Sequence, residues 1–267
     1  MQTLLSLQRV HKSYSRGGVF SRGERIDVLK GVDLSLPEGG SVGLIGLSGS
    51  GKSTLSRVAL GIERPDSGTV SYLGRDIRTG GRGCFADFRR NVQVVFQNVP
   101  ASVNPRMTAA RIIAELLSNF ESLTDKETRE RVLELLSDVG LKATDAEKLP
   151  HEFSGGELQR VCIARAIAAR PRLIVYDEAV SSLDMIVQAQ ILSLIERLRA
   201  SLGTASLFIS HDLRVVRSVC DDIAMLHEGR IVERLPAGKP LSAWSHPAAV
   251  DIARAAARSL RPSWAGV

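Results

Sequence analysis

The stretch Gly46-Leu47-Ser48-Gly49-Ser50-Gly51-Lys52-Ser53 decides how this sequence folds. Its two glycines five positions apart, followed by Lys and then Ser, are typical of a phosphate-binding loop. The apolar run from Ser41 to Ile45 before it suits a buried strand, and the residues from Thr54 to Leu60 suit the start of a helix. A flexible Gly/Ser linker is the alternative, and both flanking segments disfavour it. The sequence therefore predicts a strand, a phosphate-binding loop and a helix in succession.

The chemistry of this loop follows from its backbone and from two side chains. Glycines and small serines let the backbone N–H groups point at a phosphate, and the helix start adds partial positive charge there. Lys52 can reach the outer phosphates of a bound nucleotide, and the Ser53 hydroxyl can bind Mg²⁺. The residues expected to bind the nucleotide here are Gly46, Leu47, Ser48, Gly49, Ser50, Gly51, Lys52, Ser53 and Thr54.

Composition bounds the class of protein. The 267 residues suffice for one large domain or a domain with a subdomain, and 44% hydrophobic and 24% charged residues are ordinary for a soluble chain. There is no run of 18 apolar residues, and Met1 to Leu5 lack the features of a signal peptide. Three cysteines without metal-ligand spacing predict reduced thiols. The net charge of +6 would suit nucleic acid or an anionic membrane surface, but the basic residues are spread along the chain and the charge alone decides nothing. We expect no nucleic-acid partner.

The apolar periodicity changes along the chain. Strands are predicted at Leu4–Val10 as an edge strand, Val28–Leu36, Thr69–Leu73, Val92–Phe96, Arg172–Tyr176, Ala205–Ile209, Ile223–Leu226 and Arg230–Glu233, with a loop at Ser15–Arg25. Helices are predicted at Thr108–Phe120, from the capping box Thr124/Glu127 to Gly140, at Leu158–Arg170, Met185–Leu202 and near Ala248–Ser259. An α/β domain with a helical insertion follows. We expect its parts to be 1–97, 98–170 (helical), 171–235 and a tail at 236–267.

A second signal is the pair Asp177-Glu178 after the apolar strand Leu173 to Tyr176. In a phosphate-loop fold such a strand lies beside the loop strand, so Asp177 can hold magnesium. Glu178 then faces the space where water attacks the γ-phosphate, which makes it the expected general base. A solvated acidic turn is the alternative.

A third signal is Ser154-Gly155-Gly156 before the apolar helix that begins near Leu158. Ser154 is a good N-cap, and the glycines expose N–H groups, so the stretch forms a second anion-binding helix start. The alternative is a simple helix cap. A single nucleotide site does not need two such loops, unless the second one serves the nucleotide of a neighbouring subunit.

Together, the motifs resemble those of the ATP-binding cassette family, in order and spacing along nearly the whole chain. They are Gly46–Ser53, Gln97 after a strand, Ser154-Gly155-Gly156, Asp177-Glu178, Ser181-Ser182-Leu183-Asp184 and His211-Asp212. The resemblance implies a P-loop NTPase fold of the α/β class, with a RecA-like core, an antiparallel β subdomain and an inserted α-helical subdomain. It also implies ATP and Mg²⁺ as cofactors.

The resemblance further implies a role for each matching residue. Tyr14 would stack on adenine, and Gln97 would contact magnesium and the attacking water and report to a membrane partner. Ser154, Gly155, Gly156 and Glu157 would face the γ-phosphate held by a second cassette subunit, and Asp184 would link the two sites. His211 would hold the γ-phosphate and the water beside the catalytic Glu178. The magnesium ligands would be Ser53, Gln97 and Asp177.

Three positions in two motifs depart from the usual family pattern. The signature has Phe153 in place of Leu and Glu157 in place of Gln. We expect binding to survive, because the backbone donors of Gly155 and Gly156 are unaffected, and we expect the negative charge of Glu157 to weaken the partner site. The residue after the two carboxylates is Ala179, where Pro is usual.

The stretches Val95–Asn98, Ala101–Thr108, Asp177–Ser181 and Gly203–Arg214 resemble the nickel and peptide importer group, and the last two favour the nickel branch. This implies an ATPase subunit on the cytoplasmic face of the inner membrane, with two transmembrane permease subunits and, indirectly, a periplasmic solute-binding protein. A peptide importer is the alternative. A soluble cassette protein of ribosomes or DNA is disfavoured by the single cassette and modest insertion. A small-molecule phosphate-loop kinase has no use for Ser154 or His211.

Overall fold

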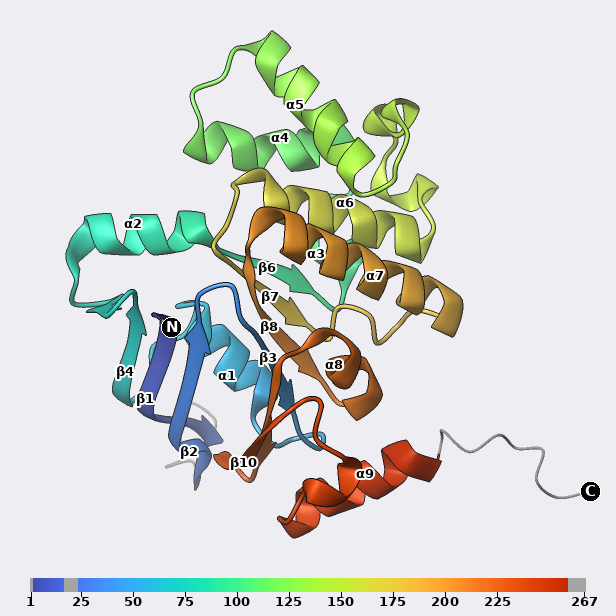
Figure 1. Cartoon of the computed structure of the whole chain (residues 1–267). Helices are drawn as coiled ribbons and strands as arrows, with labels where there is room; N and C mark the ends of the chain where they lie inside the picture. Colours follow the sequence, from blue (N-terminus) through green and yellow to red (C-terminus); the bar gives the residue numbers. More distant parts are fainter. Residues whose placement is uncertain (1, 17–23, 259–267) are drawn as a thin grey trace, which may run out of the picture. The chain divides into compact units, whose positions relative to one another are not determined.

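The computed structural model describes residues 2–16 and 24–258 (Figure 1). The strands are β1 Thr3–Arg16, β2 Glu24–Pro37, β3 Ser41–Ile45, β4 Ser67–Tyr72, β5 Arg75–Asp76, β6 Val92–Phe96, β7 Leu173–Asp177, β8 Ala205–Ser210, β9 Asp222–His227 and β10 Arg230–Pro236. The α-helices are α1 Lys52–Ala59, α2 Gly81–Asn91, α3 Val99–Ser102, α4 Ala109–Phe120, α5 Asp125–Asp138, α6 Gly155–Ala168, α7 Met185–Leu202, α8 Leu213–Val219 and α9 Pro247–Arg258. Short 3₁₀ turns are η1 Ala143–Glu147, η2 Pro150–Glu152 and η3 Leu241–Ala243.

Packing separates the chain into two units, residues 1–84 with 206–267, and residues 85–205. The four-part division at 97, 170 and 235 stays a prediction. The centre of the predicted loop at Ser15–Arg25 and the end of the predicted tail after Arg258 lie outside the described residues.

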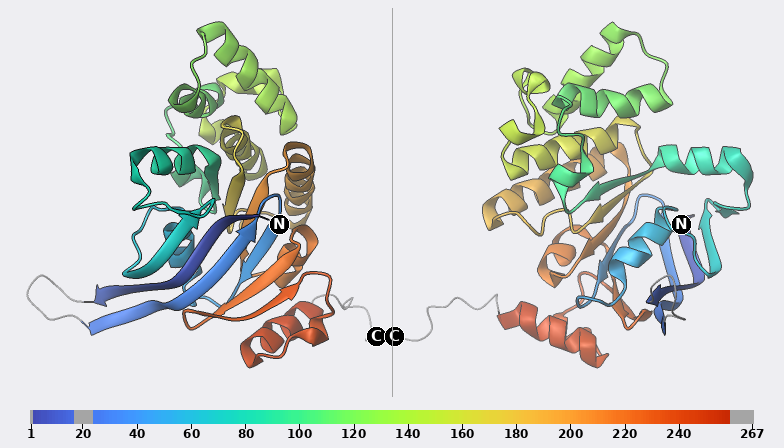
Figure 2. Two further views of the ribbon diagram at one scale, coloured as in Figure 1. Left: turned by 60° about the vertical axis from the view of Figure 1, so that its left-hand side comes forward. Right: turned by 180° about the vertical axis from the view of Figure 1, so that it is seen from behind.

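In the first unit, an antiparallel sheet has the strand order β2-β1-β4-β5. The long strands β1 and β2 run side by side, as Figure 2 shows. Leu5 pairs with Leu36 on one side and with Tyr72 on the other, so the expectation of an edge strand at Leu4–Val10 is wrong. The reason is that alternation of apolar residues reports which face of a strand is covered, and not whether both edges are paired.

The same unit holds β3 between β8 and β9, with both neighbours parallel to it, and β10 antiparallel to β9. All five residues of β3 are buried, which is why its sequence is small and apolar without alternation. Ile45 pairs with Ser210 and with Met225, so three strands reach the same sheet edge together. Gly43 is required by packing, because a Cβ there would lie 1.9 Å from Val216 of α8.

In the second unit, β6 and β7 pair in parallel and the remaining elements are helical. The helix α6 packs against α3, α4, α5 and α7, and it buries residues on most of its circumference. It is therefore the central helix of this unit. The predicted capping box of Thr124 and Glu127 is present at the start of α5, and Gly140 adopts a φ of 75° directly after that helix.

None of the helices in the described ranges combines the length and the apolar character needed to cross a membrane.

Candidate functional site

The phosphate loop lies in the first unit, between β3 and α1. Two of its glycines are required by geometry. A Cβ on Gly46 would lie 2.3 Å from the Leu226 carbonyl oxygen, and Gly51 caps α1 with a φ of 108°. Side chains other than hydrogen would block the first position and strain the second. The loop therefore keeps its backbone open toward a ligand.

The lysine of the loop is folded back over it. The Lys52 ammonium donates hydrogen bonds to the carbonyl oxygens of Gly46 (2.8 Å) and Leu47 (3.0 Å), and Lys52 as a whole is buried. Ser53 is exposed, and the Ser50 hydroxyl is buried without a hydrogen-bond partner in the described part of the chain. A fixed ammonium, an available hydroxyl and an unpaired polar atom at a helix start fit the phosphates and magnesium of a nucleotide.

His211 lies at the same edge of the sheet as the phosphate loop. It follows β8, whose last residue Ser210 pairs with Ile45, the residue before Gly46. The Ser210 hydroxyl accepts a hydrogen bond from the Asp212 backbone N–H (3.0 Å), which fixes the turn carrying His211. The parallel register thus brings together two motifs that are 165 positions apart in the sequence, counted from Gly46 to His211.

Tyr14 is also in the first unit, on β1. Tyr14 is 37% exposed, and its hydroxyl donates to the Glu63 carboxylate and lies 3.5 Å from the Thr54 hydroxyl. Thr54 belongs to α1, and its side chain is buried. Glu63 was not predicted from the sequence, because a carboxylate after a helix has no motif of its own.

In the second unit, β6 and β7 end together, since Phe96 pairs with Asp177. This register places Gln97 and Glu178 directly after neighbouring strand ends. The Gln97 amide donates to the Ser181 hydroxyl (3.1 Å), which in turn donates to the Glu178 carbonyl oxygen (2.9 Å). Glu178 itself has a φ of 50°, a conformation that costs about 1–3 kcal/mol for a residue with a side chain.

The start of α6 carries a complete capping box. The Ser154 hydroxyl accepts from the Glu157 N–H (3.3 Å), while the Glu157 carboxylate accepts from the Ser154 N–H (2.9 Å) and hydroxyl (2.8 Å). The two hydrogen bonds to its carboxylate lower the pKa of Glu157, so it is charged at neutral pH. This box was not predicted, although the Ser-x-x-Glu pattern that signals it is equivalent to the pattern that identified Thr124.

The two signature glycines differ in their surroundings. A Cβ on Gly155 would meet Leu183 at 3.7 Å, an ordinary contact, whereas a Cβ on Gly156 would lie 2.4 Å from Val187 of α7. Gly156 is therefore needed for helix packing as well as for an open helix start. Asp184 caps α7, with its carboxylate accepting from the N–H groups of Ile186 and Val187 at 3.0 Å each.

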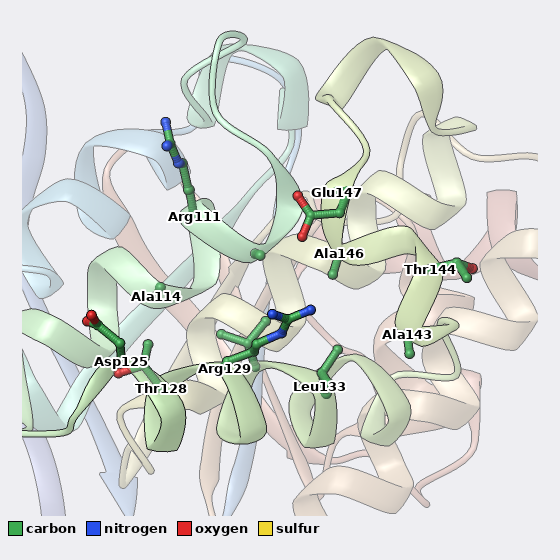
Figure 3. Close-up of a pocket in the computed structure, with 12 residues that line it drawn as sticks. Arg111, Ala114, Asp125, Thr128, Arg129, Leu133, Ala143, Thr144, Ala146 and Glu147 are labelled. Atoms are coloured by element: carbon green, nitrogen blue, oxygen red, sulfur yellow. The ribbon is translucent and has the colours of Figure 1, made fainter.

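Two hollows lie in the second unit. One, of about 590 Å³, is lined by Gln97 to Pro100, Gly155, Leu158, Gln159, Ser182 and Leu183. The other, of about 510 Å³, lies over α4, α5 and η1, and Figure 3 shows Arg111, Arg129 and Glu147 among its side chains. None of the predicted nucleotide-site residues lines this second hollow, whereas Gln97 and Gly155 line the first. The first hollow is therefore the one that contains predicted nucleotide-site residues.

A glycine loop that joins a buried parallel strand to a helix and holds its own lysine over the ligand space belongs to a P-loop nucleotide hydrolase. Residues 29–181 match the protein family described as ABC transporter, and the chain belongs to that family. The predicted resemblance and fold class are confirmed, and the protein is an ATP-binding, ATP-hydrolysing member whose hydrolysis is coupled to transport.

Curated relatives cover most of the chain. It is 43% identical to the nickel import ATP-binding protein NikE of Pseudomonas putida, over 97% of this chain and 94% of that one. It is 44% identical to the NikE protein of Rhodospirillum rubrum, over 96% and 92%. It is also 44% identical to the oligopeptide transport ATP-binding protein OppF of Lactococcus lactis subsp. lactis, over 88% and 74%.

Among solved structures, the chain resembles the dimeric ATP-binding cassette MJ0796 in a post-hydrolysis state bound to ADP and Pi. The TM-score is 0.78 with 29% identity, covering 88% of this chain and all of that one.

Proposed function

We propose that this chain is the ATP-hydrolysing subunit of an importer that takes up nickel. The observation that carries the proposal is the 43% identity to a nickel import protein over 97% of this chain and 94% of the relative, without a large uncovered segment in either. The similarity to OppF supports a di- or oligopeptide cargo as a second candidate. It ranks second because the similarity covers less of both chains.

The residues of the first unit would bind and orient the nucleotide. The Lys52 ammonium, held over the loop by two carbonyl oxygens, would exchange these contacts for the β- and γ-phosphates. The exposed Ser53 hydroxyl would be a magnesium ligand, and His211 at the shared sheet edge would hold the γ-phosphate and the attacking water. Magnesium, when bound, would neutralise charge on the outer phosphates. Tyr14 would stack on the adenine.

The residues of the second unit would act on water and metal. Glu178 would accept the proton of the attacking water, and Asp177 and Gln97 would hold magnesium at the ends of β7 and β6. The hydrogen bond from Gln97 to Ser181 provides a physical link between a magnesium ligand and the segment that leads to Asp184.

A second cassette subunit would complete the site. The start of α6 offers backbone N–H groups at Gly155 and Gly156 to an anion, and these would face the partner's γ-phosphate. Exposed apolar side chains support such an interface: Met185 and Ile186 at the start of α7 are 81% and 73% exposed, and Leu47 in the phosphate loop is 52% exposed. We also propose two permease subunits and a periplasmic binding protein as partners, with this chain on the cytoplasmic face of the inner membrane.

Gene deletion tests the cargo. A deletion strain should lose uptake of radioactive nickel and keep uptake of a labelled tripeptide. Wild-type protein should restore nickel uptake, and Glu178→Gln should not, because loss of a general base lowers turnover about 10²-fold or more. Normal nickel uptake with lost peptide uptake would transfer the assignment to the peptide importer.

A further inference from the structure

The hydroxyl of Tyr14 is anchored to the helix that begins at the phosphate loop. It donates to the Glu63 carboxylate, and Glu63 pairs with Arg57 of α1 through Nε and Oε1 at 2.7 Å. The same hydroxyl lies 3.5 Å from the Thr54 hydroxyl, also on α1. The Tyr14 hydroxyl is thus tied to α1, the helix that begins with Lys52. It approaches Thr54 of this helix, and its hydrogen-bond acceptor Glu63 pairs with Arg57 of the same helix.

The ring of Tyr14 remains able to meet a ligand. The residue is 37% exposed, and the Lys12 ammonium lies over the ring, 5.5 Å from its centroid. Lys12 is itself fixed by the Arg64 carbonyl oxygen at 2.9 Å and by Asp66 at 3.4 Å. A ring held at its hydroxyl and flanked by a fixed cation is a prepared stacking surface, not a freely rotating side chain.

We propose that Glu63 is a positioning residue for the nucleotide base: it holds the Tyr14 ring at a fixed place relative to the phosphate loop. The inference rests on the proposed function of Tyr14 as the adenine platform. In a single ATP molecule, the base has to contact the Tyr14 ring while the phosphates contact Lys52. A ring tied to α1 keeps these two contacts in register before ATP arrives.

The expected effect follows from conformational entropy. Without the anchor, the ring has to be ordered when ATP binds, and ordering one such side chain weakens affinity about three- to tenfold. A phosphate chain without a base does not touch the ring, so its affinity should not change. A purely structural role of Glu63 would instead weaken both ligands, because Arg57 and Thr54 lie in the helix that forms the phosphate site.

The experiment measures the affinity of the purified full chain for ATP and for inorganic tripolyphosphate by titration calorimetry. The variants are Glu63→Leu, which keeps much of the volume and removes the hydrogen-bond acceptor, Tyr14→Phe, which keeps the ring and removes the hydroxyl, and their combination. Tyr14→Ala tests whether the ring itself contributes to ATP binding. Glu24→Leu makes the same change at an exposed position on β2 and is the matched control.

We expect Glu63→Leu and Tyr14→Phe each to weaken ATP binding three- to tenfold, without further loss in the double variant. The tripolyphosphate affinity of these variants and the ATP affinity of Glu24→Leu should be unchanged. If Tyr14→Ala weakens ATP binding while Glu63→Leu and Tyr14→Phe do not, the positioning role is wrong and the stacking role of Tyr14 stands. If Tyr14→Ala binds ATP like the wild type, the stacking role itself is wrong. Equal losses for ATP and tripolyphosphate in Glu63→Leu would also overturn the inference.

Discussion

A carboxylate placed at the start of α6 tests whether this helix serves a second subunit. Gly155 is exposed, and a Cβ there makes only an ordinary contact with Leu183, so Gly155→Asp fits the folded chain. Gly156 is unsuitable for the test, because any side chain would collide with Val187. An acidic residue in the first turn stabilises a helix by about 0.3–1 kcal/mol, so the substitution should not destabilise the subunit.

The expected loss is electrostatic. A carboxylate about 5 Å from a partner's γ-phosphate, at an effective dielectric constant of about 20, is repelled by about 3 kcal/mol per unit charge. That corresponds to about 10²-fold in the stability of the two-subunit state. Glu157 already places one charge at this helix start, with its carboxylate held by Ser154, so we expect the added charge to act on a site that this residue has already made less favourable for anions.

The assay pairs two measurements. ATP binding to the isolated Gly155→Asp subunit should match the wild type, and ATPase activity of the assembled transporter should fall about 10²-fold. Gly155→Asn has nearly the same shape without the charge, and it should keep most of the activity. The reasoning is refuted if Gly155→Asn is as inactive as Gly155→Asp, or if the folded Gly155→Asp subunit loses ATP affinity in isolation.

Two further predictions concern stability. Gly156→Ala should lower the free energy of unfolding, measured in urea, by about 1–3 kcal/mol, because the β-branched Val187 side chain cannot move aside. Adding Val187→Ala should recover part of this loss. If the two substitutions instead destabilise the protein additively, the 2.4 Å approach between a Cβ at position 156 and Val187 is contradicted. The hydrogen bond from the Ser13 hydroxyl is the main cause that lowers the pKa of Asp66 from 3.8 to about 2, so its stabilisation is present above about pH 4 and is lost as the pH falls toward 2. Asp66→Asn should therefore lower Tm at pH 7 and match the wild type near pH 2; an equal Tm difference at both values would exclude this linkage.

Local chemistry determined much of this protein from the sequence alone. The phosphate loop was identifiable because its glycines, lysine and serine lie within eight consecutive residues, and the helix Met185–Leu202 was predicted with the bounds that the structure has. The capping box of α5 was predicted because its two partners are three residues apart. Such signals depend on neighbours along the chain, so composition and spacing suffice to detect them.

Local patterns also left gaps where the deciding contact is distant. The helix α2 was not predicted, because it starts among glycines that locally favour a loop. The edge position of β1 was predicted wrongly, because its second partner, β4, follows some fifty residues later and leaves no mark on the alternation of β1. Glu63 was not a candidate, because nothing near it in the sequence points to Tyr14.

Only the tertiary structure shows why glycine is needed for packing at Gly43 and Gly156. The sequence gives no reason for Gly43 and explains Gly156 only as part of an anion-binding helix start, whereas in the structure a Cβ at either position would overlap Val216 or Val187 of a neighbouring helix. Tertiary structure also decided the place of His211. It lies at the same sheet edge as the phosphate loop because Ser210, the residue before it, pairs with Ile45. A sequence specifies which contacts each segment can make locally, whereas close packing and strand register arise from segments far apart in the chain, and only their folded arrangement shows them.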